Sequence, residues 1–294
     1  MAANRLDFIG LIDRYIEAVY AHDSSLLPLA RSVRYTENGQ DVPLQWGLWV
    51  TARGRKFPRY LDLIDTERQQ AATFCVVEEH GRRPVILSTR IKLVGSEVTE
   101  IETLICRGIE ILFNPDGMAK PSSFFKSSIE PANRAGREDA KRIANLYFDG
   151  IERGNGKMIP INDDCIRFEN GIQTVRASTG DLTADRNMSN FGNLTAAGQI
   201  DTGFFAYIPV VSGRRYPIFD EEKNAIYGLV MMEHPGHLTE SEARGFGKMP
   251  LAEFATKPTN VMVAEAFQIE SGKIRTIGAM LDFVPYKMNS GWND

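Results

Sequence analysis

Residues that build metal and disulfide sites are scarce in this chain of 294 residues. It contains three cysteines, Cys75, Cys106 and Cys165, and four histidines. The cysteines are odd in number and lie far apart in the sequence, which argues against a disulfide framework and against a zinc site. Reduced thiols are typical of the cytoplasm, where we expect this protein to reside.

Other absences narrow the range of partners. The longest apolar runs, such as residues 227–232, are far too short to cross a bilayer, and the first residues lack the apolar core of a signal peptide. The formal net charge is −4 and no block of Lys and Arg stands out, so we expect neither a membrane nor a nucleic-acid partner. Because no glycine-rich phosphate loop joins a strand to a helix, we expect no nucleotide cofactor.

What the sequence does contain is an internal repeat. Four short patterns occur twice and in the same order, which indicates two related domains. They are an amphipathic helix with Tyr15 or Tyr147, the stretches 33–40 and 166–173, the acidic stretches 60–67 and 216–222, and the stretches 79–81 and 233–236. We predict an N-terminal domain over residues 1–120, a linker over 121–137 and a C-terminal domain over 138–294.

Each half is predicted to begin with a helix and to continue as a β-sheet. Apolar spacing predicts helices over 6–21 and 138–153, with shorter helices around 26–31 and within 43–51. Strands are predicted over 33–37, within 57–65, and over 72–79, 85–94, 98–112, 165–169, 204–211, 218–220, 225–233, 261–269 and 274–284. Insertions at 174–202 and 237–258 interrupt the second half. The polar segment 180–193 is a candidate flap, and 237–258 a candidate lid or helix.

Helices that precede strands indicate an α+β fold rather than a parallel α/β fold. We expect two tandem cone-shaped rolls, each a helix packed on a curved antiparallel sheet, with the two halves packed sheet to sheet. A cone with one open mouth suits a small apolar molecule. Further self-association of the chain stays open.

This pattern resembles the nuclear transport factor 2-like superfamily, which contains ketosteroid isomerase, SnoaL-type polyketide cyclases and scytalone dehydratase. The isomerase begins with a helix of the form Arg-Tyr-Val-Ala-Ala-Leu-x-Ala-Gly-Asp, and this chain has Arg14-Tyr15-Ile-Glu-Ala-Val-Tyr-Ala-His22-Asp23. The resemblance implies an oxyanion-hole donor at Tyr15 in the first half and at Tyr147 in the second.

Two further positions follow from the same resemblance. The family's general base is an Asp after the first strand, and the matching residues here are Glu37-Asn38 and Glu169-Asn170. The family's second oxyanion donor matches Glu265 in the second half and Thr89 in the first. The second half therefore retains both donor positions and is the better candidate for chemistry, while Asn at the base position argues against simple steroid-type isomerisation.

The second half also resembles SnoaL-like proteins of unassigned reaction, through residues 159–171 and 214–222. Tandem chains of this type are similar to the cofactor-independent lyases of lignin-dimer catabolism, which convert a diarylpropane 1,3-diol to a stilbene and formaldehyde. The resemblance implies a lyase that acts without a cofactor on a small aromatic, hydrophobic substrate. The alternatives are an isomerase, cyclase or dehydratase, and a non-catalytic small-molecule binding protein.

Several candidate residues have two interpretations. Arg34 and Arg167 alternate with Tyr35 and Phe168, so each Arg faces either the pocket or the solvent. His80 and His234 are either proton carriers or turn residues, and no carboxylate or Cys supports a metal site at the pair formed with His237. The candidate catalytic residues are Tyr147, Glu265, His234, Glu169, Asn170 and Arg167. The candidate substrate-binding residues are Tyr15, Arg34, Glu37, His80, Trp49, Phe205, Tyr207, Tyr216 and Arg215.

Overall fold

A 17-residue amphipathic helix begins each half of the protein. Helix α1 (Arg5–Ala21) starts at a capping box made by Asn4 and Asp7, and α4 (Arg137–Arg153) carries Glu138 and Asp139 in its first turn. Both helices end at a left-handed residue, which closes the last turn by bonding back to the helix. These ends lie seven residues beyond Tyr15 and Tyr147, respectively, so the two tyrosines occupy equivalent places.

The computed structural model describes residues 2–109, 112–177 and 186–292. In the first half, α1 is followed by η1 (Ser24–Leu26), β1 (Leu29–Glu37), β2 (Gln40–Asp41), α2 (Leu48–Thr51), β3 (Leu61–Asp65), β4 (Gln70–Glu79), β5 (Arg83–Val94) and β6 (Glu97–Cys106). The connection to the second half contains α3 (Pro115–Met118) and η2 (Pro131–Asn133).

The second half repeats this order with insertions. Helix α4 is followed by η3 (Gly156–Met158), β7 (Ile161–Glu169), β8 (Ile172–Gln173), α5 (Arg186–Gly192), α6 (Ala196–Asp201), η4 (Phe204–Tyr207), β9 (Val210–Asp220), β10 (Ala225–His234), β11 (Glu240–Ala243), β12 (Gly247–Pro250), η5 (Glu253–Thr256), β13 (Thr259–Glu270) and β14 (Lys273–Pro285).

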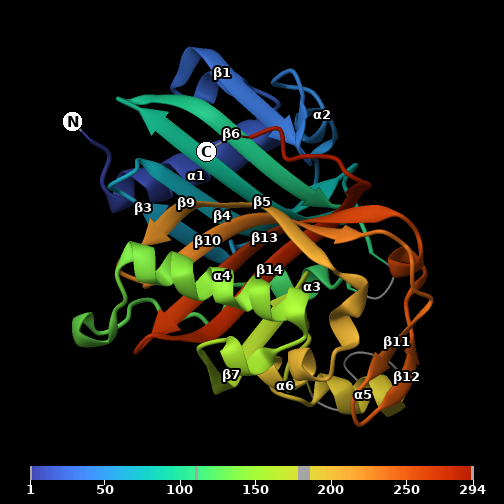
Figure 1. Ribbon diagram of the computed structural model, residues 1–294. Coiled ribbons are helices and arrows are strands. Elements are labelled where there is room, and N and C mark those ends of the chain that lie inside the picture. The colour runs from blue at the N-terminus through green and yellow to red at the C-terminus, as the bar shows by residue number, and fades with distance from the viewer. Residues whose placement is uncertain (1, 110–111, 178–185, 293–294) are drawn as a thin grey trace.

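Two six-stranded sheets with the same topology follow from the repeat (Figure 1). Their strand orders are β2-β1-β6-β5-β4-β3 and β8-β7-β14-β13-β10-β9. The expected α+β fold of two tandem rolls, each a helix on a curved sheet, is therefore confirmed. The sheets are mixed rather than wholly antiparallel, because β1 pairs parallel to β6 and β7 pairs parallel to β14. The exact domain limits at 120 and 138 stay a prediction.

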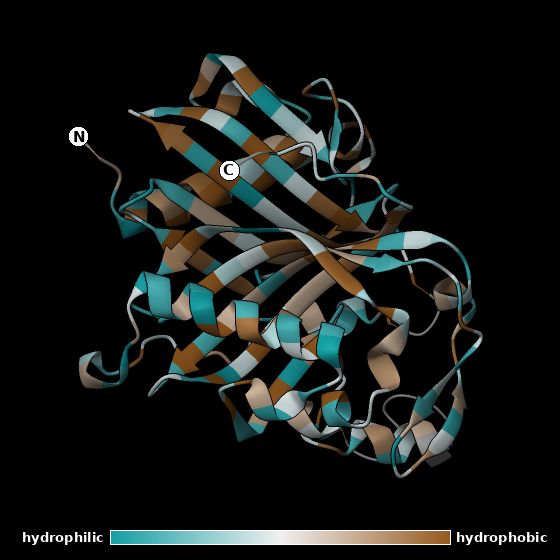
Figure 2. Ribbon diagram, viewed as in Figure 1, coloured by the Kyte–Doolittle hydropathy of each residue, from teal (hydrophilic) through white to brown (hydrophobic). Residues whose placement is uncertain are grey.

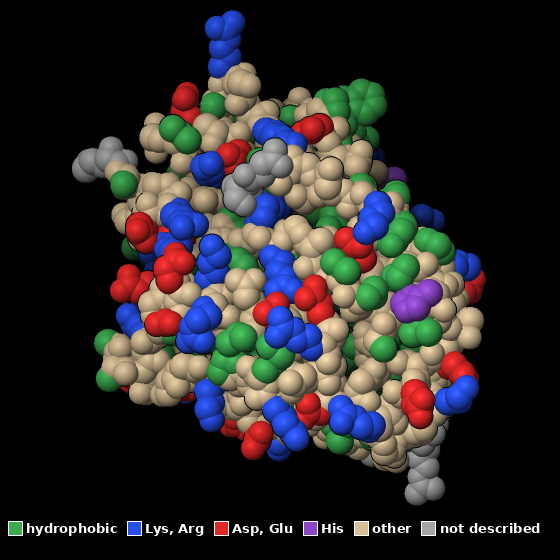
Figure 3. All heavy atoms as spheres, viewed as in Figure 1, with side chains coloured by type: hydrophobic (Ala, Val, Ile, Leu, Met, Phe, Trp, Pro, Cys, Tyr) green, Lys and Arg blue, Asp and Glu red, His purple; other side chains and the backbone are tan. Residues whose placement is uncertain are grey.

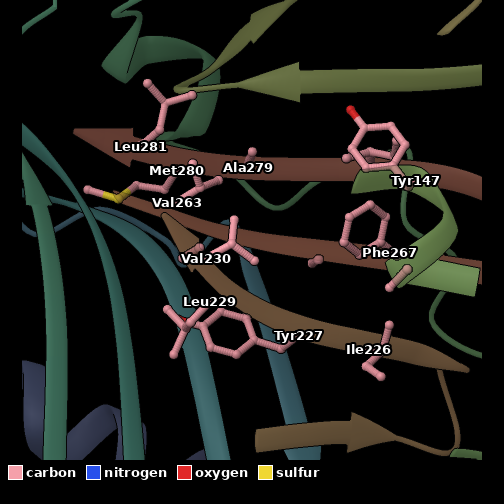
Figure 4. Packing of buried hydrophobic residues seen from close by; sticks show 14 of the residues in the cluster. Tyr147, Ile226, Tyr227, Leu229, Val230, Val263, Phe267, Ala279, Met280 and Leu281 are labelled. Carbon is pink, nitrogen blue, oxygen red and sulfur yellow. The ribbon is translucent and has the colours of Figure 1, made fainter. Parts of the chain in front are cut away.

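The two sheets pack against each other through apolar side chains, as expected. Tyr227 of β10 reaches the first sheet, where its ring meets Phe74 edge-on at 5.8 Å between centroids and its hydroxyl bonds to Ser88 at 2.8 Å. Figure 4 shows Tyr227 and Leu229 beside the strands of the first half. The opposite face of the second sheet lies under α4, along which hydrophilic and hydrophobic residues alternate (Figure 2).

The C-terminal tail crosses back over the first half (Figure 1). The Trp292 ring lies between two guanidinium groups, those of Arg34 at 4.0 Å and Arg90 at 4.7 Å from its centroid. Its indole nitrogen donates to Thr36 at 3.1 Å. These contacts tie the end of the chain to β1 and β5.

Three local expectations need correction. Residues 26–31 hold the end of a short 3-10 turn and the start of β1 rather than a helix, and residues 204–207 form η4 rather than a strand. The insertion 237–258 forms the β11–β12 hairpin and η5. Most of the predicted elements are confirmed with small changes of bounds. The candidate flap at 180–193 falls partly outside the described residues, which resume at 186 with α5.

The surface carries charges of both signs. Figure 3 shows Lys and Arg side chains intermixed with Asp and Glu over the visible face. Among the described residues, the helices are too short or too polar for any of them to traverse a lipid bilayer.

Candidate active site

The strand β7 carries Arg167 and Glu169 into the interior of the second roll. Side chains alternate along a strand, so these two residues share the face that α4 covers, while Phe168 points the other way and packs on Phe124 at 4.6 Å between centroids. Arg167, for which the sequence allowed either the pocket or the solvent, therefore faces inward, together with Glu169. Both also line a cavity of the second half.

The guanidinium of Arg167 is almost fully buried and organises the polar end of this cavity. It donates to Tyr147 Oη at 3.0 Å, to Thr174 Oγ1 at 2.9 Å and to Gln199 Oε1 at 2.8 Å. A carboxylate oxygen of Glu169 lies 3.4 Å from its Nε. Burial by itself lowers the pKa of Arg167, but Glu169 and Tyr147 outweigh burial and hold that pKa above its ordinary value. Arg167 is therefore a fixed positive charge.

Tyr147 is positioned by packing and polarised by Arg167. Its ring lies against Phe267 of β13 at 5.2 Å and against Phe148 at 5.5 Å, and its hydroxyl points away from Phe267 (Figure 4). Because Arg167 donates to the Tyr147 oxygen, the hydroxyl proton is available for another acceptor. Burial raises the pKa of Tyr147, so the phenol stays protonated and acts as a donor.

Glu265 supplies a second carboxyl group, which is deeply buried. It lies on β13 opposite Ala279 and is only 2% exposed. Burial, helped by the negative charge of Glu169 and opposed by Arg167, raises the pKa of Glu265 to about 8. Its Oε2 has no hydrogen-bond partner among the described residues. Glu265 is therefore a neutral acid at pH 7, close to the fixed charge of Arg167.

The cavity itself has a volume of about 420 Å³, within the range of small-molecule sites. One end holds the polar cluster of Tyr147, Arg167 and Glu169. Most of the remaining wall is apolar and comes from η4, β10, β12 and the η5 segment, including Phe204, Phe205, Tyr207, Met232, Met249 and Phe254. Phe205 and Tyr207, expected to bind substrate, thus lie in the wall. Such a wall suits a flat aromatic ligand.

His234 also lines the cavity, at the end of β10. It is 2% exposed, and its ring lies 5.2 Å from that of Tyr207 and 6.1 Å from that of Phe254, between centroids. Burial lowers the pKa of His234 to about 4, which keeps the imidazole neutral at pH 7. Among the described residues, no group of three or more His, Cys, Asp or Glu side chains is arranged to hold a metal ion.

The equivalent interior of the first half is filled by its own side chains. Trp49 of α2 is fully buried and meets the rings of Tyr15 and Tyr35 edge-on at 5.9 and 6.4 Å. The carboxylate of Glu37 accepts from Tyr35 Oη at 2.5 Å and from the Leu48 N–H at 2.7 Å. Tyr15 and Trp49, which we expected to bind substrate, are therefore core residues of the first roll, and Glu37, expected to do the same, is half-buried and bonded to Tyr35 and to the Leu48 backbone.

Structural equivalence also corrects the alignment of the repeat. Asn38 and Asn170 both have φ near 45° and bond to the backbone of the last strand of their sheet. When these two turns are superposed in sequence, the residue of the first half that is equivalent to Arg167 is Tyr35, not Arg34. A shift of one residue moves a side chain to the other face of a strand. Arg34 accordingly lies on the outer face, paired with Asp41 and stacked on Trp292.

The other expected site residues lie away from the cavity for identifiable reasons. Arg215 forms a buried ion pair with Glu102 of β6, which also bonds to Arg90 at 2.8 Å, and so joins the two sheets. Tyr216 donates to Asn145 of α4 at 3.0 Å. His80 is exposed in the β4–β5 turn, with φ of 54°.

Asn170 is a structural residue rather than a cavity residue. Its amide donates to the carbonyls of Leu281 and Leu112, both at 3.0 Å, and accepts from the Leu281 N–H at 3.0 Å. We expect Asn170→Ala to lower the free energy of unfolding by about 1–3 kcal/mol, because three buried backbone groups lose their partner.

The matched variant Asn38→Ala should lose a similar amount, since its amide makes the same pair of bonds to Ile105. Urea titration of both variants, beside activity per folded molecule, tests this role. Unchanged stability with lost activity in Asn170→Ala would instead make Asn170 a catalytic residue.

Two site residues were missed by the sequence reasoning. The side chains of Thr174 and Gln199 accept hydrogen bonds from the Arg167 guanidinium. The Gln199 amide also donates to the Thr174 carbonyl at 2.6 Å. Both belong to the insertion after β8, which has no counterpart in the first half to mark its positions. A Gln in a polar segment carries no pattern that predicts complete burial.

Comparison with known proteins places the second half in a family. The model described as "Domain of unknown function (DUF8021)" matches residues 133–281, which are 149 of the 294 residues. A solved structure, an NTF-2-like protein of unknown function from Burkholderia xenovorans LB400, is 12% identical over 35% of this chain and 84% of that chain, with a TM-score of 0.29. No curated protein matches the chain.

The DUF8021 match spans the whole cluster just described, from Tyr147 on α4 through Arg167 and Glu169 on β7 to Glu265 on β13. It also contains His234. The first half, whose interior is filled, lies outside the match. The chain therefore belongs to the DUF8021 family.

Proposed function

We propose that the cavity of the second half is the active site of a cofactor-independent lyase for a small phenolic molecule. The substrate class is a diarylpropane 1,3-diol or a related lignin-derived aromatic, and the products are a stilbene, formaldehyde and water. One observation carries the proposal: the buried Arg167–Tyr147 pair and Glu169 line one end of an aromatic cavity, and the buried acid Glu265, whose pKa is raised to about 8, lies close to Arg167. Perturbed acids around a cavity are typical of catalytic sites.

The proposed reaction uses these groups in sequence. Glu265, as the protonated acid, gives its proton to the benzylic hydroxyl, which leaves as water. The phenol para to that carbon supplies the electron pair and releases its proton to solvent, so that a quinone methide forms. Glu169 then takes the proton of the terminal hydroxyl, and the adjacent carbon–carbon bond breaks to release formaldehyde.

The electron pair of the broken bond forms the stilbene double bond. The electron pair of the exocyclic double bond of the quinone methide returns through the ring to the phenolic oxygen, which takes a proton back from solvent. Tyr147, backed by the positive charge of Arg167, is the donor that stabilises negative charge on that oxygen. The quinone methide serves as the electron sink, which is why the reaction needs no cofactor. Proton transfer from Glu169 back to Glu265 resets the site.

Tyr147→Phe should reduce the rate of stilbene formation by about tenfold or more, since it removes one preorganised donor and leaves the ring in place. Stilbene absorbance in purified protein is the measurement. Tyr15→Phe is the matched control, because Tyr15 occupies the equivalent place in the filled first half, where its hydroxyl bonds to Thr103 at 3.3 Å. An unchanged rate in Tyr147→Phe would remove Tyr147 from the mechanism.

A second candidate is an isomerase, cyclase or dehydratase that stabilises an enolate. The placement of a protonated Glu265 near Tyr147 favours it, because such a pair can donate two hydrogen bonds to one developing oxyanion. A carrier protein is the third candidate, although two buried titratable groups with shifted pKa values, Glu265 and His234, are more typical of an enzyme. Formaldehyde release separates the lyase from both.

A further inference from the structure

His234 presents unused hydrogen-bonding capacity to the cavity. Neither ring nitrogen has a hydrogen-bond partner among the described residues, although the side chain is 98% buried. Buried polar groups in folded proteins are nearly always paired, so each exception calls for an explanation. A ligand group that enters the cavity is one such explanation, because His234 lines its wall.

The ring of His234 is held in place by its surroundings. Its backbone pairs with Thr259 of β13 as the last rung of the β10 ladder. Two residues later, Gly236 has φ of 70° and packs so closely on the peptide between Lys257 and Pro258 that a Cβ there would lie 2.7 Å away. The side chain itself lies between the rings of Tyr207 and Phe254. The imidazole therefore meets a ligand at a fixed place.

The surroundings of His234 are otherwise apolar. The nearby wall is made of Met232, Phe254 and Phe283, and burial alone, with no charged neighbour, accounts for the lowered pKa of His234. A neutral imidazole has one donor and one acceptor nitrogen. It can therefore pair with a hydroxyl group without placing a charge in an apolar wall.

We propose that His234 recognises a hydroxyl group on the far ring of the ligand, so that the cavity selects aromatic molecules that are polar at both ends. One end of the ligand meets the cluster of Tyr147, Arg167 and Glu169, and the other meets His234. This inference rests on the proposed function, because it names the substrate class of the same cavity: a two-ring phenol with a hydroxyl group on each ring.

Direct binding of two product-like probes tests the proposal without turnover. The probes are a stilbene with a para-hydroxyl group on one ring and a stilbene with a para-hydroxyl group on both, titrated by calorimetry. The wild-type protein should bind the second probe at least about fivefold more tightly, since only that probe satisfies His234 and the polar cluster together. Equal affinities, or no binding of either probe, would overturn the proposal.

Variants then assign the preference to His234. In His234→Phe, which keeps an aromatic ring between Tyr207 and Phe254, the two probes should bind with equal affinity. In His234→Gln, which keeps a donor and an acceptor, part of the preference should return. His80→Phe, at an exposed turn of the first half, should keep the wild-type preference. A preference that survives in His234→Phe would also overturn the proposal.

The probe experiment and the lyase assay can fail independently of each other. If the probe preference depends on His234 but no formaldehyde forms from the diol, the recognition stands and the lyase reaction fails. If the diol is cleaved but His234→Phe leaves the probe preference intact, the lyase stands and the recognition by His234 fails.

Discussion

Arg167→Met should reduce turnover by about a hundredfold or more, because it removes the charge that polarises Tyr147 and stabilises the phenolic oxygen. The variant should also lose about 3–5 kcal/mol of unfolding free energy, since Glu169, Thr174 and Gln199 are left in or beside an apolar interior without their cation. Steady-state rates, corrected for the folded fraction by circular dichroism, measure the first effect, and urea titration measures the second.

Arg167→Lys tests the role of Arg167 in catalysis even if the Met variant unfolds. Lysine retains the charge but cannot bond to Tyr147, Thr174 and Gln199 at once, so we expect a folded protein with a reduced rate. Arg34→Met is the matched control, because Arg34 is the sequence echo of Arg167 yet lies on the outer face beside Trp292. A wild-type rate in Arg167→Lys would show that the fork of hydrogen bonds plays no part in catalysis.

Glu265→Gln should be less active but more stable than the natural protein. An amide resembles the protonated carboxyl in shape but cannot give up a proton, so the rate should fall by about a hundredfold. Stability changes in the other direction because the pKa of Glu265 is about 8 in the folded protein against an ordinary value of 4.5. The folded state therefore holds a proton that the unfolded chain releases.

The sign of the pH effect follows from this difference. Where the folded state binds more protons, stability falls as pH rises, here between about pH 4.5 and pH 8. At pH 7 the raised pKa of Glu265 lowers the free energy of unfolding by an amount on the order of 3 kcal/mol. Glu265→Gln should restore about 1–3 kcal/mol of that stability.

Urea titrations of both proteins at several pH values check this expectation. The stability difference should shrink toward pH 4.5, and the wild-type rate should decline as pH rises through about 8, as Glu265 loses its proton. Glu270→Gln, on the same strand but partly exposed and paired with Lys126, should change stability little. Equal stability of Glu265→Gln and wild type at every pH would mean that Glu265 is charged in the folded protein.

Much of the fold could be predicted because the repeat and the periodicity are local signals. Tyr147 recurs in a helix whose length and end match those of α1, and the Thr89–Thr103 pair of the first sheet aligns with Glu265–Ala279 of the second. The resemblance to the isomerase, applied to both halves, predicted Tyr147 and Glu265 as the two donors, and these structural equivalences agree with an interior place for both. The same recurrence wrongly predicted that Tyr15 binds substrate. A functional tyrosine also depends on its neighbours, and in the first half Tyr35 occupies the position that Arg167 has in the second.

The rest depends on contacts that no short window of sequence contains. Both faces of β7 are covered, by α4 on one side and by Phe124 of the connection on the other, so alternation alone could not decide which face Arg167 takes. The partners Thr174 and Gln199 and the wall residue Phe254 come from insertions without a repeat partner. Arg215 was expected to bind substrate, whereas it pairs with Glu102, which lies more than a hundred residues away in the sequence.

The most direct test of the central claim is the stoichiometry of products formed from a phenolic diarylpropane 1,3-diol. The purified protein is treated with chelator, dialysed and assayed without any added cofactor, while formaldehyde and stilbene are measured in the same sample. We expect one formaldehyde for each stilbene, with the rate lost in Tyr147→Phe and retained in Tyr15→Phe. Neither product from a folded protein, or stilbene without formaldehyde, would contradict the lyase assignment.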